Sequence, residues 1–267
     1  MENTTTEPVK KFMVEYFQSI DLGHWENKIS STSSKILTLK NPKKKLYYIT
    51  DFYLSYLQLL EIFIINALIF ATREHAFLEN LFISNKKTKE RVEKYFNKQF
   101  YTWFLDNYVF GFKEKEKINN FEQKYKDYLN VLEECVNDYT KDYDFLNAYK
   151  HGFRVNATDK GAVAINGYPL LNTNTVFTYF SKEFDEKEKE DIIYRKTIML
   201  NYERFIMKAH FLLSMLQNTQ KVFLGQEHRP GKQFKLDHFF IVDEKKWNKS
   251  YGFYRHKEPL FAKHRKI

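Results

Sequence analysis

The sequence predicts a mainly α protein, an up-and-down helical bundle with a small β insertion and a basic C-terminal extension. Gly and Pro number only 8 and 5 in 267 residues, so turn-forming residues are few and the elements should be long. Hydrophobic residues make up 43% of the chain and aromatic residues 18%, which is enough for a large core. Apolar side chains also recur at helical spacing in residues 121–139 and 198–216.

The chain divides into three expected parts. Residues 1–45 should form an N-terminal helix and a polar connector, and residues 46–224 the helical bundle. The β insertion is expected within the bundle at about residues 156–195, and residues 225–267 should form a basic aromatic tail.

The N-terminal part begins with a helix start signal. Pro8 suits the first helical position, because its N–H would have no partner there, and residues 9–20 should continue the helix. Residues 30–34 are all serine or threonine and are predicted to form the connector. The breaker Asn41-Pro42 and the basic cluster of residues 43–45 should end it.

A long helix is predicted from Leu46 to about Leu81, and it raises a membrane question. Residues 52–72 are long enough to span a bilayer and carry one formal charge, Glu61. In a helix, which turns by about 100° per residue, one polar stripe is formed by Asp51, Ser55, Gln58 and Asn66. Lipid offers no partner for such a stripe. We therefore expect a central bundle helix and no membrane span. A membrane-associated effector is the alternative.

Two more helices are predicted before the β insertion. The first should run from about Lys87 to Val109, with one apolar face formed by Val92, Phe96, Phe100 and Trp103. The second should run from Ile118 almost to Gly152. Its inward face follows the spacing of an amphipathic packing helix, and consists of Phe121, Tyr125, Tyr128, Leu132, Cys135, Tyr139, Leu146 and Phe153.

Short β-like runs follow, bounded by Gly and Asn residues. Residues 162–165 and 176–180 are expected to be strands, and residues 191–194 are a candidate third strand. A last helix is predicted from Lys196 to Phe223, with the same heptad-like spacing as the helix from Ile118. These two helices should pack on each other or on a partner.

The charge and cysteine content point to the compartment and the partner. The formal charge is +9, and residues 225–267 hold eleven Lys or Arg against five Asp or Glu. Such a balance suits an anionic partner such as RNA, DNA or a membrane surface, although a lysine-rich surface gives the same sum without one. The single cysteine, Cys135, cannot form an internal disulfide, and the N-terminus shows no secretory signal. We expect a cytoplasmic protein.

Several enzyme classes are excluded by their missing motifs. The chain has no Walker loop, dinucleotide glycine pattern, nucleophile elbow, zincin motif or paired-cysteine site. His75 and His210 lie on predicted helices and are interpreted as bundle histidines. The remaining tail histidines lack ligand spacing, so neither a metal nor another cofactor is expected.

One constellation could carry chemistry, at the end of the helix that starts at Ile118. Helical spacing places Asp144, Asn147, His151 and Arg154 along one side, opposite Leu146 and Phe153. In the structural interpretation, Lys150 and His151 complement the negative end of the helix dipole and Gly152 terminates the helix. In the functional interpretation, His151 transfers a proton while Lys150 or Arg154 holds a phosphate.

The segment Asn147-Ala148-Tyr149-Lys150-His151-Gly152 resembles the Asn-x-x-Lys-His-Gly variant of the HEPN motif. HEPN domains are four-helix bundles, and many occur in bacterial toxin and phage-defence proteins. The resemblance covers roughly residues 46–223. Asn147 matches the polar position of the motif and His151 its histidine. Leu146 stands where the family usually has arginine.

The resemblance implies a metal-independent endoribonuclease that acts as a homodimer, with two motifs meeting across the dimer interface. The ribose 2′-hydroxyl would attack the adjacent phosphate, with His151 as acid and base and Asn147 positioning it or the phosphate. Lys150 and Arg154 would stabilise charge. Without the arginine, the same bundle would instead be a catalytically inactive module that binds a protein partner or nucleic acid.

The tail offers a second candidate contact with RNA. Its aromatic residues alternate with cations in Lys245, Lys246, Trp247, Lys249, Tyr254 and Arg255. Such a segment can stack on bases while holding phosphates. The alternative is that these aromatic residues pack back on the bundle.

Overall fold

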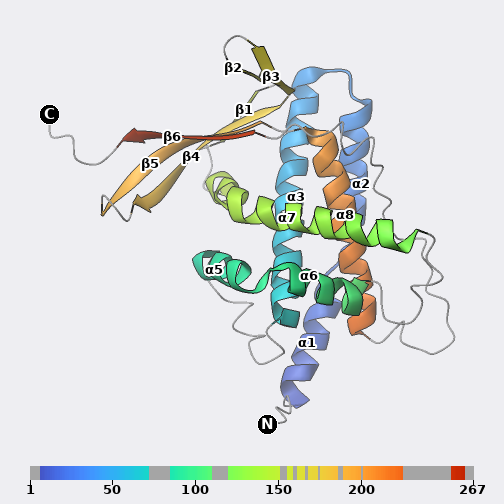
Figure 1. The fold of residues 1–267 in the computed structure, drawn as a ribbon. Coiled ribbons are helices and arrows are strands. Elements are labelled where there is room, and N and C mark those ends of the chain that lie inside the picture. Colours follow the sequence, from blue (N-terminus) through green and yellow to red (C-terminus); the bar gives the residue numbers. More distant parts are fainter. Residues whose placement is uncertain are drawn as a thin grey trace. The chain divides into compact units, whose positions relative to one another are not determined.

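A computed structural model describes residues 7–71, 85–109, 120–150, 155–158, 161–165, 168–173, 175–185, 189–199, 201–224 and 254–261. The mainly helical class is confirmed (Figure 1). The helices are α1 (Glu7–Ser19), α2 (Leu22–Thr38), α3 (Pro42–Ala71), α5 (Asn85–Tyr95), α6 (Lys98–Phe104), α7 (Phe121–Lys150) and α8 (Tyr202–Phe223). A short π-helix, η1 (Leu105–Val109), continues α6.

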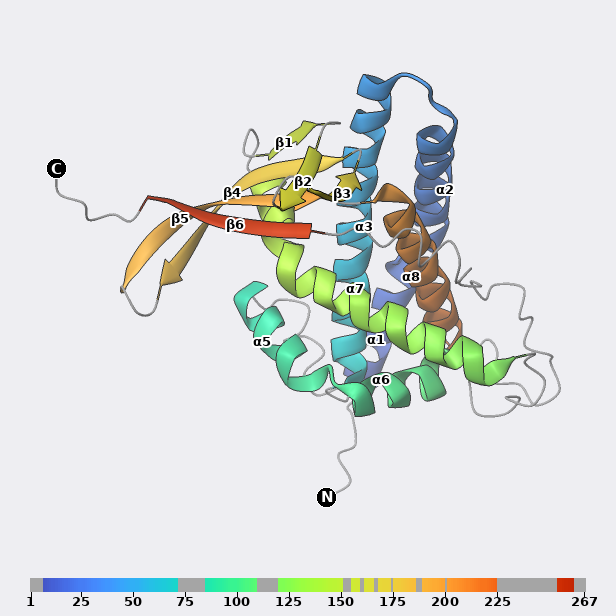
Figure 2. The same cartoon turned by 45° about the horizontal axis from the view of Figure 1, so that its top comes forward.

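The β insertion is larger than the sequence predicts. Its strands are β1 (Val155–Thr158), β2 (Gly161–Ile165), β3 (Tyr168–Thr173), β4 (Val176–Asp185) and β5 (Glu190–Met199), and β6 (Tyr254–Phe261) joins them from the tail. The described strands form a four-stranded sheet of order β1-β4-β5-β6 and a separate β2-β3 hairpin (Figure 2). All pairings are antiparallel.

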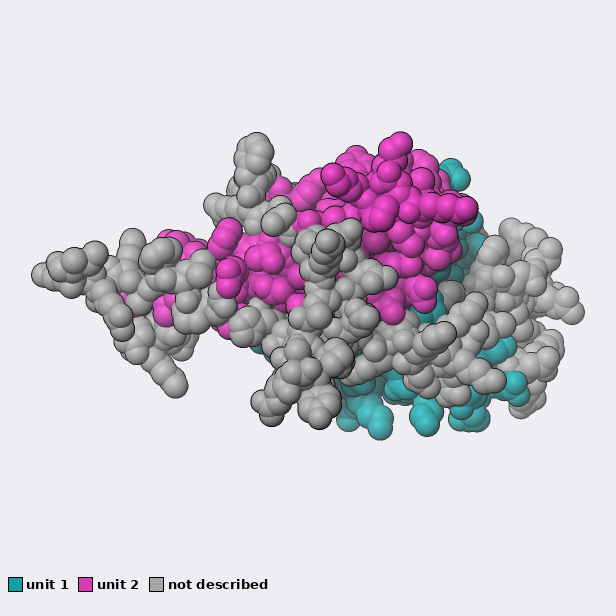
Figure 3. All heavy atoms as spheres, turned by 90° about the horizontal axis from the view of Figure 1, so that it is seen from above, with its two compact units in different colours: residues 1–30, 58–140, 207–242 teal, residues 31–57, 141–206, 243–267 magenta. Residues whose placement is uncertain are grey.

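The chain forms two compact units, each built from discontinuous segments (Figure 3). Unit 1 comprises Met1–Ser30, Gln58–Thr140 and Met207–Val242. Unit 2 comprises Ser31–Leu57, Lys141–Ile206 and Asp243–Ile267, and it includes the sheet and the end of α7. The sequence division into residues 1–45, 46–224 and 225–267 stays a prediction.

Unit 1 is held together by helix contacts between aromatic rings. The rings of Tyr128 on α7 and Phe211 on α8 are 4.7 Å apart at their centroids, so these two helices pack on each other as predicted. Phe63 on α3 meets Phe104 on α6 at 5.6 Å. Most of the predicted inward face of α7 is buried, including Cys135.

A buried ion cluster lies in the same unit. The Lys208 ammonium is 4% exposed and contacts Asp138 Oδ2 at 2.6 Å and Glu134 Oε2 at 3.2 Å. Burial lowers the pKa of Lys208, but the charges of Asp138, Cys135 and Glu134 outweigh it and leave the pKa above its ordinary value. Lys208 is therefore charged inside the fold.

Unit 2 is centred on Tyr53 of α3. Its ring packs against Phe145 of α7 at 5.0 Å, Phe177 of β4 at 5.4 Å and Phe205 of α8 at 4.9 Å. Its hydroxyl donates a hydrogen bond of 3.0 Å to the buried carboxylate of Asp142. One side chain therefore joins two helices, α7 and α8, and the sheet to α3.

The predicted polar connector at residues 30–34 is wrong, because these residues lie inside α2. Serine and threonine cost a helix only a few tenths of a kcal/mol per residue relative to alanine, roughly 0.5. Ile29 and Ile36 are fully buried at a spacing of two helical turns, and Thr32 and Ser33 are buried between them. Packing therefore outweighs the weak local preference.

The helix predicted from Lys87 to Val109 is broken into α5, α6 and η1. Asn97 adopts extended backbone angles, and its side chain accepts a hydrogen bond of 3.0 Å from the backbone N–H of Phe100. An asparagine that caps a new helix in this way stops the preceding one.

The predicted start of the last helix at Lys196 is also wrong. Lys196 and Ile198 lie in β5, which pairs with β4 on one side and β6 on the other. The helix α8 begins only after Asn201, whose side chain accepts a hydrogen bond of 2.9 Å from the backbone N–H of Glu203. The apolar residues of this strand also fit the helical spacing of the residues that follow. The sequence pattern therefore assigned residues 196–199 to the helix.

Helix α3 begins at the Asn41-Pro42 breaker, and Asn41 accepts a hydrogen bond from the backbone N–H of Lys44. Among the described residues it is the one helix long and apolar enough to cross a membrane. However, 78% of its apolar window is buried in the fold, as in the core helix of a soluble domain. The polar stripe also has protein partners, since Tyr16 donates a hydrogen bond of 3.0 Å to Asn66.

We predict that Lys208→Met lowers the free energy of unfolding by about 3–5 kcal/mol, because it leaves the buried carboxylate of Asp138 without its cation. Denaturant titration measures the change. The double variant Lys208→Met/Asp138→Leu should recover much of the loss. Lys11→Met, at a lysine whose side chain is 79% exposed, is the matched control and should have little effect. Equal stability of Lys208→Met and wild type would contradict the prediction.

Candidate functional site at the end of helix α7

The residues of the predicted motif lie at the end of α7. Asn147 and Lys150 belong to its last turn, and their side chains lie outside the described part of the structure. His151 and Arg154 lie outside the described residues. The side chains of the neighbouring residues 144–146, 148 and 149 are described, and they show which side of the helix end is buried.

Most of the last turns of α7 face the core of unit 2. Phe145, Leu146 and Ala148 are buried, and Phe145 packs against Phe177 and Tyr179 of β4 at 5.1 and 5.4 Å. Leu146, at the position where the HEPN motif usually has arginine, is 1% exposed. A cation at that position would lose its hydration. The buried Leu146 position therefore does not offer a place for the arginine of the motif.

Tyr149 is the exposed aromatic residue of this helix end. It lies within the resembling segment, between Ala148 and Lys150, and 49% of its side chain is accessible. An exposed tyrosine next to basic residues offers a face on which a base can stack. The sequence pattern did not single out this residue, because it lies off the predicted polar side.

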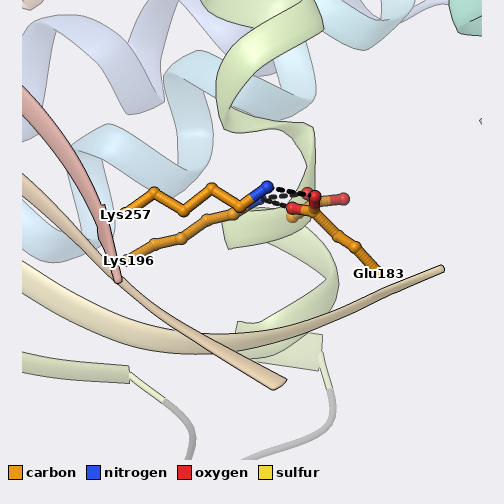
Figure 4. Close-up of polar contacts among 4 residues, drawn as sticks. Glu183, Lys196 and Lys257 are labelled. Carbon is orange, nitrogen blue, oxygen red and sulfur yellow. Dashed lines mark hydrogen bonds and ion pairs between the residues drawn. The ribbon is translucent and has the colours of Figure 1, made fainter. Parts of the chain in front are cut away.

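The polar side of α7 begins with an ion pair. Asp144 Oδ2 contacts the Lys196 ammonium of β5 at 2.7 Å. Lys196 also contacts Glu183 Oε1 of β4 at 2.5 Å, and Lys257 of β6 contacts Glu183 Oε2 at 2.5 Å. Figure 4 shows both ammonium groups reaching the same carboxylate.

This ion network shifts the pKa values of Lys196 and Glu183. Burial lowers the pKa of Lys196, but hydrogen bonds and charges from Asp144 and Glu183 outweigh it and raise the pKa above 10.5. Burial raises the pKa of Glu183, but the hydrogen bonds and charges of Lys196 and Lys257 outweigh it and bring the pKa below 4.5. Lys196 and Glu183 are therefore both ionised at neutral pH.

The network anchors α7 to the sheet and leaves little net charge. Two ammonium groups face two carboxylates, so Asp144 does not present an uncompensated negative charge beside the motif. Sequence reasoning missed Glu183, Lys196 and Lys257, because it placed Lys196 in a helix and left Glu183 beyond its expected strand. The alternation of Phe177, Tyr179 and Glu183 on one face of β4 is the signal that could have found them.

The tail candidates are divided between described and undescribed residues. Tyr254 and Arg255 lie in β6, where they pair with Met199 and Ile198 of β5. Lys245, Lys246, Trp247 and Lys249 lie outside the described residues. Residues 254–261 therefore have a structural role as a strand of the sheet. A contact of the tail with RNA stays a prediction.

No group of metal-ligating side chains occurs in the described part of the chain. His75 lies outside that part, as do the tail histidines except His256. His210 is half-buried on α8, and burial lowers its pKa against the opposing charge of Glu26. Burial opposes the protonation of His210. This histidine therefore fits the predicted role of a bundle residue better than the role of a proton donor.

Comparison of the chain with models of protein families, with curated proteins and with solved structures gives no match. The resemblance to the HEPN family therefore rests on residues 147–152 and on the helical class alone.

We predict that Glu183→Gln changes the acid sensitivity of the protein. The pKa of Glu183 lies below 4.5 in the folded state, so its stabilising contribution is present above that pH and is lost as the pH falls through the folded-state pKa. Wild type should therefore lose more stability than Glu183→Gln does as the pH falls below 4.5. Urea titrations across this range measure the difference, with Glu93→Gln, at an exposed glutamate of α5, as the control. Parallel pH profiles for wild type and Glu183→Gln would refute the assignment.

Proposed function

We propose that this chain is a cytoplasmic HEPN-like protein that acts on RNA at the end of α7, as a component of a toxin or phage-defence system. In this proposal it is a metal-independent endoribonuclease that works as a homodimer. The 2′-hydroxyl of the substrate attacks the neighbouring phosphate and expels the 5′-oxygen of the next nucleotide, which leaves a 2′,3′-cyclic phosphate. His151 transfers the hydroxyl proton to the departing 5′-oxygen, and Asn147 positions the reacting groups. Lys150 and Arg154 stabilise the charge that develops on the phosphate.

The observation that carries the proposal is the composition of the helix end. Asn147 and Lys150 occupy the last turn of a long helix, as the HEPN resemblance requires, and the exposed Tyr149 lies between them. The pairing of Asp144 with Lys196 supports it, because a free carboxylate beside the motif would repel a phosphate. The net charge of +9 favours a polyanionic partner.

Burial of Leu146 favours a second candidate, binding without cleavage. The usual arginine offers a planar fork that matches a phosphate, and lysine at a neighbouring position does not replace that geometry. If Lys150 and Arg154 do not supply the missing charge, the chain is a catalytically inactive module that holds RNA or a protein partner.

We predict that His151→Ala abolishes RNA cleavage, or RNA-dependent toxicity in cells, and leaves the melting temperature nearly unchanged. Loss of a proton shuttle costs about 10²–10⁴-fold in rate, whereas loss of a histidine that only complements the helix dipole costs roughly 0.3–1 kcal/mol of stability. Asn147→Ala should reduce the rate less. Gel assays with labelled RNA, in the presence and absence of a chelator, measure both effects.

The control for this test is His24→Ala, at an exposed histidine of α2, which should cleave like wild type. Cleavage that survives His151→Ala would show that the nuclease mechanism is wrong. Binding of RNA by wild type without any cleavage would select the second candidate.

We predict that the triple variant Lys245→Gln/Lys246→Gln/Lys249→Gln weakens RNA binding and reduces its salt dependence, because fewer counterions are released. Unlike deletion of the tail, the variant preserves β6. The control removes the same charge at exposed lysines of α5 and α6, Lys87, Lys94 and Lys98. Fluorescence anisotropy at several salt concentrations gives the slopes. If the salt dependence of RNA binding has the same slope in the two triple variants, the tail lysines contribute only through the total charge of the protein.

A further inference from the structure

The turn between α2 and α3 concentrates positive charge at the surface of unit 2. Residues 35–48 contain five lysines, and residues 27–50 contain no Asp or Glu. Figure 1 shows this turn joining the end of α2 to the start of α3. We call residues 35–48 the basic corner. Its lysines are Lys35, Lys40, Lys43, Lys44 and Lys45.

The charge of the basic corner is not neutralised within the fold. Lys40, Lys43 and Lys44 are exposed, and in the described part of the chain no carboxylate pairs with any of the five lysines. Helix stability does not account for them either, because the first turn of α3 has no acidic residue and the dipole at this end of a helix favours anions over cations. Five lysines against no carboxylate leave a local charge that an anionic partner can meet.

The other two lysines contact aromatic residues, which leaves their charge in place. The Lys35 ammonium of α2 lies 4.9 Å from the ring centre of Tyr48 on α3. Lys45 donates a hydrogen bond of 3.0 Å to the Tyr202 hydroxyl of α8. The contact of Lys35 with Tyr48 joins the end of α2 to the start of α3, so the side chains around the turn belong to one surface.

Exposed apolar side chains lie among these lysines. Tyr47 is 69% exposed and Leu37 is 60% exposed, and they are the two most exposed large hydrophobic residues in the described part of the chain. A nucleic acid base can stack on the tyrosine ring but offers no comparable contact to leucine. At a bilayer surface, tyrosine lies at the level of the headgroups, leucine enters the acyl boundary and lysine contacts anionic headgroups. The combination therefore suits a lipid surface better than RNA.

We propose that the basic corner binds the surface of an anionic lipid bilayer, with its lysines on headgroup phosphates and with Leu37 and Tyr47 in the interface. The contact is peripheral, because 78% of the apolar window of α3 is buried inside the fold. It is also reversible, because stable anchoring requires more apolar area than two side chains provide. This contact is separate from the RNA chemistry proposed for the end of α7 and does not depend on it.

Flotation of the full chain with lipid vesicles tests the charged part of the contact. Wild type should float with vesicles of phosphatidylcholine and phosphatidylserine in equal parts, should not float with phosphatidylcholine alone, and should bind more weakly as salt is added. Lys40→Gln/Lys43→Gln/Lys44→Gln should weaken binding roughly 100-fold, since each lysine near an anionic leaflet contributes about 5-fold. Lys40→Arg/Lys43→Arg/Lys44→Arg keeps the charge and should float like wild type.

Leu37→Gln tests the apolar part of the contact. It should weaken binding to the same vesicles roughly 10-fold and leave the salt dependence unchanged, because no charge is lost. Since Leu37 and the substituted lysines are exposed, the melting temperatures should stay at the wild-type value.

Two control variants carry matched substitutions at other exposed positions. Lys87→Gln/Lys94→Gln/Lys98→Gln removes the same charge from α5 and α6. Phe12→Gln removes an apolar side chain of α1 that is 58% exposed. Both control variants should float like wild type.

The outcomes separate this contact from the proposed function. Wild type that does not float with the anionic vesicles would overturn the inference and leave the RNA chemistry untouched. Equal losses in the two Lys→Gln triple variants would assign binding to the total charge and would overturn it as well. Fluorescence anisotropy with labelled RNA is measured on the same variants. If the lysine variant of the corner loses RNA binding while Leu37→Gln floats like wild type, the corner is a nucleic-acid contact and the lipid assignment is wrong.

Discussion

Lys196 is the residue on which the arrangement of unit 2 depends. Its ammonium is mostly buried and requires two carboxylates, which come from α7 and β4. A buried cation without these partners would destabilise the fold by several kcal/mol, about 3–5. The end of α7 and the β4–β5 register are therefore fixed together, and Lys257 adds the tail strand through Glu183. The candidate motif follows directly on this anchored turn.

The two faces of the sheet differ in burial. Tyr53 and Phe145 pack against the inner face, where alternate residues of β4 complete the aromatic core. The same alternation leaves Phe180 and Phe184 exposed on the outer face.

Leu146 decides how the resemblance to the HEPN family is interpreted. The residue is buried, so the family's arginine position points into a core of aromatic and aliphatic side chains. A charge could enter that core only with a buried partner. Cleavage in this chain would therefore depend on Lys150 or Arg154, whereas RNA binding could also use the exposed Tyr149. Binding places fewer geometric demands on the site than in-line attack on a phosphate does.

The sequence by itself determined the mainly helical class and the inward face of α7, because each depends on spacing within one segment. It placed the start of α3 at Leu46, whereas the helix begins at Pro42. It also predicted that strands lie between α7 and α8. Tertiary structure alone decided that residues 30–34 are helical, that Lys196 is in a strand, and that β6 completes the sheet. These outcomes depend on partners far away in the chain. Lys196 forms an ion pair with Asp144 and lies opposite Lys257 in the strand register. Such long-range contacts outweigh local secondary-structure preferences of roughly 0.5 kcal/mol per residue. They leave no periodic pattern in the sequence.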